Sequence, residues 1–438
     1  MINNNTHTVD IKKIGKIDPV TGLYNRYSFL YTVDLYINDC KNPDMEFAIL
    51  LININGFKDI NDYLGISIGD NILIEFSKRL MSVKTENYII SRINADEFSI
   101  FCKTKDADEI EKLAAEILAV IRVPFVVNNC SLHLNGRIGI SKYPHDGEDV
   151  ETLMRSADIA MSRAREIHGR KICFFSREMY EEIKDNFLYA NHLTNSISNN
   201  ELSIHYQPIF DIKDCKEIKG LEALLRWENC TLGRVGPDAF IPLAEKSGQI
   251  VSIGKWVLEN VCKQINFWKM KGYKAVPVSV NISVKQLEQI EFSKKAIDIL
   301  NNYNIDPNLI ELEITESVSS GDIATISNNL RDLKEFGMTI SMDDFGTGFS
   351  SLGQLDYFEL DKIKIDKFFI DDVIKHKKKQ KLLETIISLG NSLDLTIVAE
   401  GIETKEQLSY LNSLDCQLGQ GFLISRPLVA EEVEMFLK

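Results

Sequence analysis

The stretch TISMDDFG, residues Thr339–Gly346, is a short apolar run that ends in two adjacent carboxylates and a glycine. Apolar runs of about four to eight residues that stop at turn residues are typical of β-strands. Eight such runs occur between residues 201 and 438, and most are separated by segments with helical periodicity. Alternating strands and helices pair mainly in parallel, so the sequence predicts an α/β fold with a closed (β/α)8 barrel.

The first two of these runs differ from the rest. In chain order the eight runs are SIHYQPIFDI, GLEALLRW, VPVSVNIS, LIELEITE, TISMDDFG, DKIKIDKFF, LTIVAEGI and QLGQGFLI. Only the segment KDCKEIK separates the first run from the second, which favours an antiparallel pair over a helical crossover. We therefore expect a barrel with an irregular first strand.

Polar residues recur where the runs end. They are Glu222, Asn281, Glu313, Glu316, Asp343, Asp344, Lys364, Asp366, Glu400, Glu403 and Gln420. The C-terminal strand ends of such a barrel meet at one mouth, where enzymes of this architecture place their chemistry. Carboxylates gathered there repel one another unless cations neutralise them, and hard divalent cations prefer oxygen ligands. The adjacent Asp343 and Asp344 suit two bridged ions that clamp a phosphodiester for attack by water.

A plainer interpretation fits each of these residues taken singly. An acidic residue after a strand is usually a solvated loop position or a helix N-cap, and TESVSSGD (Thr315–Asp322) has the composition of capping residues. Recurrence at successive strand ends weakens this interpretation, although the recurrence depends on the strand assignments. From the residues alone, a metal-dependent phosphoryl-transfer site and ordinary loop chemistry both stay open.

Composition excludes several other classes of function. The net charge of −14 argues against a DNA or RNA footprint, which needs basic surface to neutralise phosphates. The eight cysteines contain no CxxC pair, so we expect reduced thiols and a cytoplasmic location. No apolar run approaches the roughly 18 residues of a membrane span, so we expect no direct membrane insertion.

With 438 residues the chain is too long for a single core, which predicts two domains. Residues 17–175 alternate strand and helix patterns, and include a hairpin whose polar tip starts at Asn94. The charged, amide-rich segment 176–200 predicts a linker helix between this domain and the barrel domain, 201–438. Residues 1–16 form an N-terminal extension that is too short for a sensor domain, so we expect any sensor to lie upstream of this chain.

Seven motifs of the second domain stand in one order, namely EALLRW, NIS, LEITES, DDFGTGFSSL, KID, AEGIET and QGFLISRPL. Together they resemble the EAL-domain cyclic di-GMP phosphodiesterases across the whole domain. The resemblance implies a TIM-like barrel that hydrolyses cyclic di-GMP to linear pGpG with two Mg²⁺ or Mn²⁺ ions. It also implies a homodimer formed through this domain.

The resemblance assigns a role to each matching residue. The positions that match metal ligands are Glu222, Asn281, Glu313, Asp343, Asp344 and Glu400. Lys364 matches the lysine that orients or deprotonates the attacking water, and Glu403 and Gln420 match residues that steady it. Gln207 and Arg226 match substrate contacts, and Asp366 belongs to the same network around the substrate and the water. Glu316 matches a glutamate that anchors the following GTGFSS loop, which in the family leads to the dimer interface.

The first domain carries DPVTGLYNR, INGFKDIND, Gly69–Asp70 and ADIAMSRAREIHG in order, with NADEF at Asn94–Phe98. Over nearly its full length it resembles the GGDEF domain, the diguanylate cyclase fold, with NADEF at the signature position. Asn61 and Asp70 match positions that contact guanine and ribose, and Asp96 matches a metal-ligand position. The resemblance therefore implies a GTP site at these three residues.

Departures from the pattern predict that this GGDEF domain is degenerate. Ala95 adds a Cβ where a glycine lets the backbone approach phosphate. Asn53 and Asn55 stand where the pattern has aspartates, and a neutral amide lacks the charge that Mg²⁺ binding needs. We expect no cyclase activity and a regulatory or dimerising role for the domain, while GTP binding without turnover stays open.

Three hypotheses for the whole chain result. The first is a cyclic di-GMP phosphodiesterase regulated by its degenerate GGDEF domain. The second is a non-enzymatic guanine-nucleotide receptor, which has no need for the complete metal set and Lys364. The third is a bifunctional cyclase and phosphodiesterase, which Asn53 and Ala95 disfavour.

Overall fold

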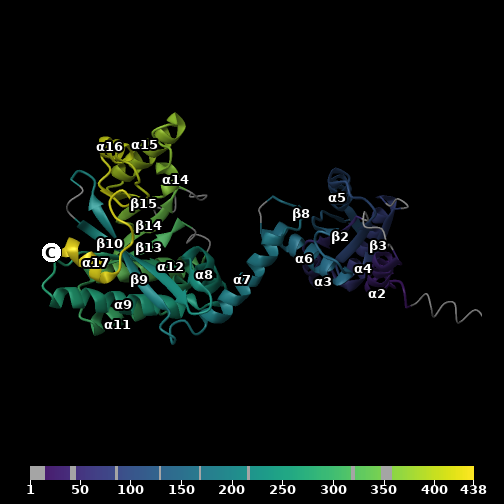
Figure 1. The fold of residues 1–438 in the computed structure, drawn as a ribbon, viewed down its shortest axis with the longest axis horizontal. Helices are drawn as coiled ribbons and strands as arrows, with labels where there is room; N and C mark the ends of the chain where they lie inside the picture. The colour runs from purple at the N-terminus through teal and green to yellow at the C-terminus, as the bar shows by residue number, and fades with distance from the viewer. Residues whose placement is uncertain are drawn as a thin grey trace, which may run out of the picture. The chain divides into compact units, whose positions relative to one another are not determined.

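The computed structural model describes residues 15–39, 46–83, 87–127, 130–166, 169–214, 218–316, 321–346 and 358–438. The chain divides into two compact units, Met1–Asp185 and Asn186–Lys438. The division falls inside helix α7 (Arg177–Leu193), which is labelled in Figure 1. Among the described residues, no helix is both long and apolar enough to cross a bilayer.

The first unit is a sheet with helices on both faces. In its described part, six strands pair in the order β1-β3-β4-β2-β7-β8. Their bounds are β1 (Tyr24–Asn25), β2 (Phe47–Ile54), β3 (Tyr88–Arg92), β4 (Glu97–Cys102), β7 (Gly136–Tyr143) and β8 (Ile172–Phe174), and a separate hairpin joins β5 (Phe125–Val127) to β6 (Cys130–Leu132). The apolar strand β2 lies between antiparallel β4 and β7, which explains its nearly complete burial.

Helices cover this sheet because its strands present apolar residues to both sides. One core cluster joins β2 and β4 to α4 (Ile66–Val83) and α5 (Ala107–Arg122). Another joins the opposite face to α2 (Arg26–Asp39) and α6 (Val150–Glu166). The short helix α3 (Phe57–Leu64) follows β2 directly. The predicted α+β domain with its central hairpin β3–β4 is confirmed.

The second unit is a closed barrel. Among its described residues, eight strands pair around the barrel, namely β9 (Leu202–Asp211), β10 (Ile218–Asn229), β12 (Val278–Ile282), β13 (Ile310–Thr315), β14 (Thr339–Phe345), β15 (Lys362–Ile365), β16 (Thr396–Ala399) and β17 (Leu418–Gly419). The seven strands β10, β12, β13, β14, β15, β16 and β17 pair in parallel in this order. Strand β9 closes the barrel antiparallel to both of its neighbours, β10 and β17. The predicted barrel and its irregular first strand are confirmed.

Helices lie outside the barrel strands (Figure 1). The longer ones are α8 (Pro237–Ser247), α9 (Ile250–Met270), α11 (Phe292–Asn302), α12 (Ile323–Phe336), α15 (Lys377–Ser392), α16 (Lys405–Ser413) and α17 (Ala430–Leu437). Shorter elements are β11 (Gly233–Val235), α10 (Val284–Leu287), the 3-10 turn Pro307–Leu309 and α14 (Lys367–Ile370). Asp322 caps α12, so the last residue of TESVSSGD has the capping role that the plainer interpretation gave to that segment.

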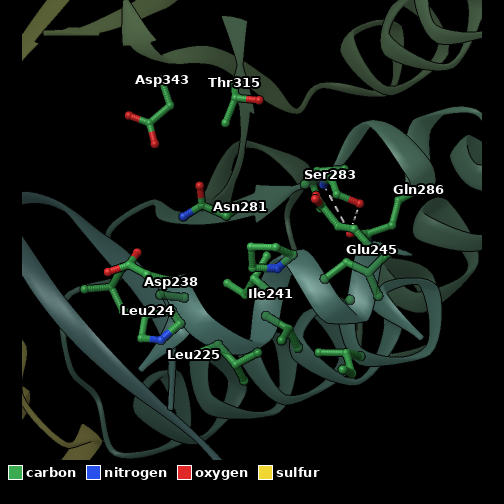
Figure 2. Close-up of a pocket in the computed structure, with 18 of the residues that line it drawn as sticks. Leu224, Leu225, Asp238, Ile241, Glu245, Asn281, Ser283, Gln286, Thr315 and Asp343 are labelled. Atoms are coloured by element: carbon green, nitrogen blue, oxygen red, sulfur yellow. Dashed lines mark hydrogen bonds between the residues drawn. The ribbon is translucent and has the colours of Figure 1, made fainter. Parts of the chain in front are cut away.

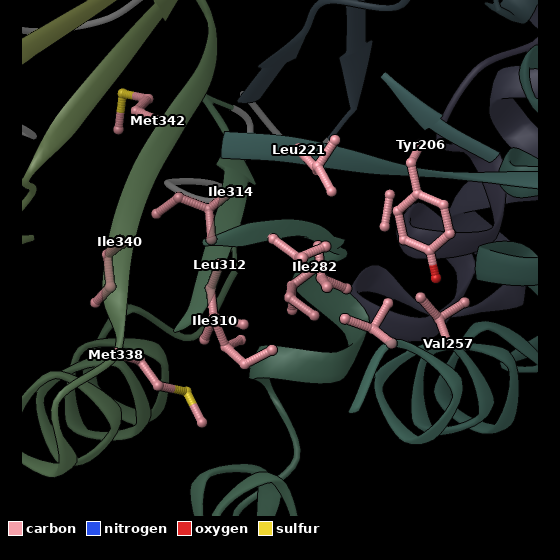
Figure 3. Close-up of a cluster of buried hydrophobic side chains, with 14 of the residues drawn as sticks. Tyr206, Leu221, Val257, Ile282, Ile310, Leu312, Ile314, Met338, Ile340 and Met342 are labelled. Carbon is pink, nitrogen blue, oxygen red and sulfur yellow. The ribbon is translucent and has the colours of Figure 1, made fainter. Parts of the chain in front are cut away.

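The two-residue period of the strands positions the site. In β13, Ile310, Leu312 and Ile314 are buried in the apolar core, and Figure 3 shows them beside Ile340 and Met342 of β14. Because successive side chains of a strand point to opposite faces, the alternate residues of β13 and β14 face the barrel interior. Burial of each large apolar side chain stabilises the fold by about 1.5–3 kcal/mol. The same alternation that packs the core thus sends carboxylates into the barrel.

Candidate active site

The barrel strands bring the predicted polar residues to one end. Glu222 lies on β10, Asn281 on β12, Glu313 on β13, Asp343 and Asp344 on β14, and Lys364 on β15, while Glu400 and Gln420 follow β16 and β17. The parallel register aligns Asn281 with Glu313 and Thr315 with Asp343. The C-terminal ends of seven neighbouring strands therefore supply one cluster of polar side chains.

Lys364 is the centre of this cluster. Its Nζ lies 2.7 Å from Glu400 Oε1 and 3.0 Å from Glu313 Oε2. It also lies 3.2 Å from Glu222 Oε2 and 3.4 Å from Asp343 Oδ1. Lys364 is 1% exposed, so a single buried ammonium faces four carboxylates.

Two amides complete the ring around the lysine. Asn281 Nδ2 donates to Glu222 Oε1 at 3.2 Å. Gln420 Nε2 donates to Glu222 Oε2 at 2.7 Å and to Glu400 Oε1 at 3.2 Å. Gln420 therefore holds the carboxylates of Glu222 and Glu400 in place. The structure thus brings Gln420 together with the predicted metal ligands.

The carboxylates carry more negative charge than Lys364 can offset. Burial raises the pKa of Glu400 to about 8, and the nearby Asp343 and Glu222 add to the rise. Burial, with Glu222 close by, also raises the pKa of Glu313 well above its ordinary value. Burial and the neighbouring Asp343 raise the pKa of Asp344 to about 6. Burial and mutual repulsion thus favour the protonated forms of Glu400, Glu313 and Asp344 in this arrangement.

At Lys364 and Glu222, neighbouring groups outweigh the effect of burial on the pKa and favour the charged forms. Burial alone would favour neutral forms of both side chains. The four carboxylates outweigh burial at Lys364 and raise its pKa well above the ordinary value. The Lys364 ammonium and the Gln420 and Asn281 amides outweigh burial at Glu222 and lower its pKa. In this arrangement Lys364 is a buried cation that forms ion pairs with the carboxylates.

The donor set fits hard divalent cations by its chemistry. The predicted ligands supply only carboxylate and amide oxygens, which Mg²⁺ and Mn²⁺ prefer. Within the described residues, Glu313 Oε1 is buried without a hydrogen-bond partner. Among the described residues, no group of three acidic, histidine or cysteine side chains is arranged as a ready-made metal site.

Asp344 connects the cluster to Asp366. Asp344 has a φ of 54°, in the left-handed region, and its N–H donates to Asp343 Oδ1 at 3.0 Å. Asp366 lies close enough to contribute to the raised pKa of Asp344. Asp366 also caps α14 by accepting from Phe368 N at 2.8 Å. Two adjacent strand ends thus supply a pair of carboxylates beside the main cluster.

Two predicted residues lie at the edge of the cluster. Glu316 is buried, and its Oε2 accepts from Gly346 N at 3.3 Å, at the start of the GTGFSS loop. The rest of that loop, residues 347–351, lies outside the described residues. Glu403 is 43% exposed on its side chain and pairs with Lys367 Nζ at 2.5 Å, so its ion pair is with Lys367 rather than with Lys364.

A cavity of about 380 Å³ opens beside the cluster, and Figure 2 shows residues that line it. Asn281, Asp343 and Asp344 border it, and Arg226 of β10 lies on its wall. Gln207 pairs across the sheet with Glu222, and its Nε2 donates to Ser425 O at 3.2 Å. The lining of the cavity thus combines Arg226 with three polar residues of the strand ends, Asn281, Asp343 and Asp344.

Sequence reasoning missed the helical wall of this cavity. Asp238, Ile241 and Glu245 on α8 line it together with Leu224 and Leu225 (Figure 2). The signal was present, because Gly236 and Pro237 start a helix directly after β11 and spacings of three and four residues share one helix face. Nothing in the local sequence said which face would line a cavity.

In the first unit, an amide from β2 pairs with a carboxylate at the tip of the β3–β4 hairpin. Asn53 Nδ2 donates to Asp96 Oδ2 at 3.0 Å. The amide thus faces the carboxylate where two carboxylates would hold a cation. Asn61 on α3 packs on Gly69 of α4, where an added Cβ would lie 1.9 Å from Asn61 Oδ1, and Asp70 is the next residue. The described structure therefore places Asn61 and Asp70 on neighbouring helices and Asp96 at the hairpin tip.

Two protein families match the chain. The EAL domain family matches residues 190–427, and the family described as diguanylate cyclase, GGDEF domain, matches residues 15–171. Together these matches cover both units, in the order that the sequence motifs predicted.

Individual relatives carry both domains as parts of longer chains. Cyclic di-GMP phosphodiesterase NbdA of Pseudomonas aeruginosa is 31% identical over 100% of this chain and 56% of the relative. Oxygen sensor protein DosP of Escherichia coli is 35% identical over 97% of this chain and 52% of the relative. The chain therefore spans about half the length of these relatives. A solved structure of the PaMucR phosphodiesterase in complex with c-di-GMP is 36% identical, with a TM-score of 0.53, over 56% of this chain and 99% of that one.

Proposed function

Because the chain belongs to the EAL domain family and carries a GGDEF domain ahead of its barrel, we propose that the barrel hydrolyses cyclic di-GMP to linear pGpG. Support for the substrate comes from similar proteins named cyclic di-GMP phosphodiesterases, and from the c-di-GMP complex of the PaMucR phosphodiesterase. The observation that carries the proposal is the buried Lys364 among four carboxylates, next to a cavity with an arginine on its wall.

Two Mg²⁺ or Mn²⁺ ions fit this site. Glu222, Asn281, Glu313 and Asp343 would hold one ion, and Asp343, Asp344 and Glu400 the other. The raised pKa values of Glu400 and Asp344 support this assignment, because cations stabilise the ionised carboxylates that burial disfavours. When bound, the ions supply the positive charge that activates water and stabilises the phosphodiester during displacement.

The side chains of the barrel divide the remaining work. Lys364, held as a buried cation, donates a hydrogen bond that orients the attacking water. Gln420 keeps Glu222 and Glu400 in place through its amide. Arg226 and Gln207 bind the substrate, and an arginine suits a phosphodiester. The water oxygen bonds to phosphorus while the bond to the ribose 3′ oxygen breaks. One proton of the water passes to that 3′ oxygen, and pGpG leaves with a 5′ phosphate and a free 3′ hydroxyl.

Chelation tests the metal requirement. We expect the purified protein to convert cyclic di-GMP to pGpG with Mg²⁺ or Mn²⁺ and to lose this activity in excess EDTA, with recovery when either ion is restored. Ion binding should also raise the melting temperature, since a ligand at about 100 times its Kd stabilises the folded state by about 2.7 kcal/mol. Hydrolysis that survives EDTA, or no hydrolysis with either ion, would contradict the proposal, and tight binding without hydrolysis would favour a receptor.

The GGDEF domain is proposed to regulate the barrel without making cyclic di-GMP. The hydrogen bond between Asn53 and Asp96 supports this role, because it replaces a pair of metal-binding carboxylates with an amide and one acid. We also propose that GTP binds at Asn61, Asp70 and Asp96. A homodimer through the barrel and a cytoplasmic location are also proposed, the latter because the described cysteines at 102, 173, 230, 262 and 416 are free.

Incubation with GTP tests the loss of cyclase activity. We expect no cyclic di-GMP from GTP and Mg²⁺, because Asn53 and Asn55 cannot supply the carboxylates that hold the ion. The Glu222→Ala variant is incubated with GTP, so that hydrolysis in the barrel cannot remove the product. The nucleotides are then separated by chromatography. Cyclic di-GMP formed from GTP would show that the GGDEF domain is an active cyclase.

A further inference from the structure

The last turns of helix α7 pack against Trp227 of the barrel. The rings of Tyr189 and Trp227 meet edge to face, with centroids 6.2 Å apart. Trp227 is 1% exposed, and Leu193 at the end of α7 is buried in the same core. Tyr189 and Leu193 both belong to the C-terminal part of α7 (Arg177–Leu193).

Glu201 fixes Trp227 through hydrogen bonds. Glu201 Oε2 accepts from Trp227 Nε1 at 3.0 Å and from Asn229 Nδ2 at 2.9 Å. Asn229 Nδ2 also lies 3.4 Å from Nδ1 of His192, in the last turn of α7. Glu228 N donates to Glu201 O at 3.0 Å. Glu201 thus joins Trp227 to Asn229, and Asn229 in turn contacts His192 at the end of α7.

On β10, the face opposite to Trp227 carries Arg226, the proposed substrate contact, and Glu222. Arg226 directly precedes Trp227 in β10, and successive side chains of a strand point to opposite faces. Glu222, four residues before Arg226, shares the face of Arg226. Arg226 lines the cavity and Glu222 contacts Lys364. Arg226 is therefore the cavity-lining residue that is bonded directly to Trp227 in β10.

Trp227 also contacts the helical wall of the cavity. Its ring meets that of Phe240 on α8 edge to face, with centroids 5.5 Å apart. Asp238 and Ile241, which flank Phe240 on that helix, line the cavity (Figure 2). Trp227 thus touches α7 on one side and, on the other, the helix that forms the cavity wall.

We infer that Trp227, held by Glu201, is a positioning residue that sets Arg226 and the α8 wall for substrate. The identity of the ligand, cyclic di-GMP, rests on the proposed function. Neither Glu201 nor Trp227 contacts the reacting atoms in this account.

A double-mutant cycle tests this role. Glu201→Ala should weaken cyclic di-GMP binding about tenfold, measured by equilibrium dialysis in EDTA to prevent hydrolysis. It should raise KM similarly with Mn²⁺ while changing kcat less than about threefold. In an Arg226→Ala background, Glu201→Ala should change the Kd less than twofold, because the group that it positions is gone. Trp227→Phe keeps the ring but loses the Nε1 donor, and it should behave like Glu201→Ala.

The matched control is Glu434→Ala. Glu434 also accepts two hydrogen bonds, from Lys271 at 2.7 Å and Tyr273 at 2.9 Å, and it does not line the cavity. This variant should leave the Kd within twofold. An unchanged Kd in Glu201→Ala, or equal losses with and without Arg226, would overturn the inference even if hydrolysis is normal. A chain that binds with this pattern but does not turn over would contradict the proposed function alone, and no binding by the unmodified chain would overturn both.

Discussion

Replacement of Lys364 by methionine is expected to reduce kcat for cyclic di-GMP hydrolysis at least about 10³-fold, the scale of losing a preorganised charged donor in an active site. Lys364 is the only ammonium that the described structure places within 3.4 Å of Glu222, Glu313, Asp343 and Glu400. Methionine keeps much of the side-chain length but supplies neither the charge nor the donors. The measurement is initial rates at saturating Mn²⁺ and substrate.

Folding must be separated from catalysis in this variant. Loss of one partner from a buried charged group destabilises proteins by about 3–5 kcal/mol, so melting should be followed by circular dichroism with and without Mn²⁺. Divalent ions should recover much of the lost stability without restoring turnover. The control is Lys334→Met, which removes an ion pair of 3.0 Å with Asp361 on the outside of the barrel and should leave kcat within about threefold. A folded Lys364→Met protein with a tenth of normal activity would exclude an essential lysine.

Glu222→Ala is expected to abolish hydrolysis, with a loss of at least about 10³-fold, and to leave the fold intact. Glu222 is 5% exposed and contacts Lys364, Asn281 and Gln420 together. Its removal takes away a proposed metal ligand and the acceptor of both amides. Because the cluster has an excess of carboxylates, the loss of one negative charge relieves repulsion and offsets part of the packing loss.

The measurement for Glu222→Ala combines product chromatography with a melting curve. Calorimetric titration with Mn²⁺ should show weaker binding than in the unmodified protein. Glu384→Ala provides a matched control, since it removes a carboxylate that accepts from Tyr410 at 2.9 Å on the outer helices. Turnover that survives Glu222→Ala would show that the metal assignment is wrong.

Sequence periodicity was sufficient to predict the barrel and the group of polar residues at its mouth. In IELEIT of β13, alternation separates Ile310, Leu312 and Ile314 in the core from Glu313 in the site. The order of strand runs then places Glu222, Asp343 and Lys364 at one end, because parallel strands share their C-terminal edge. The short link between β9 and β10 was likewise sufficient to predict that these two strands pair antiparallel.

Contacts between distant residues were not predictable from these patterns. The pairing of Glu403 with Lys367 depends on how the loop after β16 meets α14. The bond between Asn53 and Asp96 joins residues 43 positions apart across two strands, so the sequence showed the substitution but not the new partner. The contact of Tyr189 with Trp227 depends on how a linker helix packs, which its charged and amide-rich composition does not specify.

Hydrolysis in water enriched in ¹⁸O shows whether the carboxylate and lysine cluster directs water to a phosphodiester of cyclic di-GMP. The purified chain is incubated with cyclic di-GMP and Mn²⁺, and the products are analysed by mass spectrometry. We expect pGpG with a single ¹⁸O atom in its 5′ phosphate, and none of this product from the Lys364→Met protein. Intact cyclic di-GMP after incubation with either Mn²⁺ or Mg²⁺ would contradict this expectation.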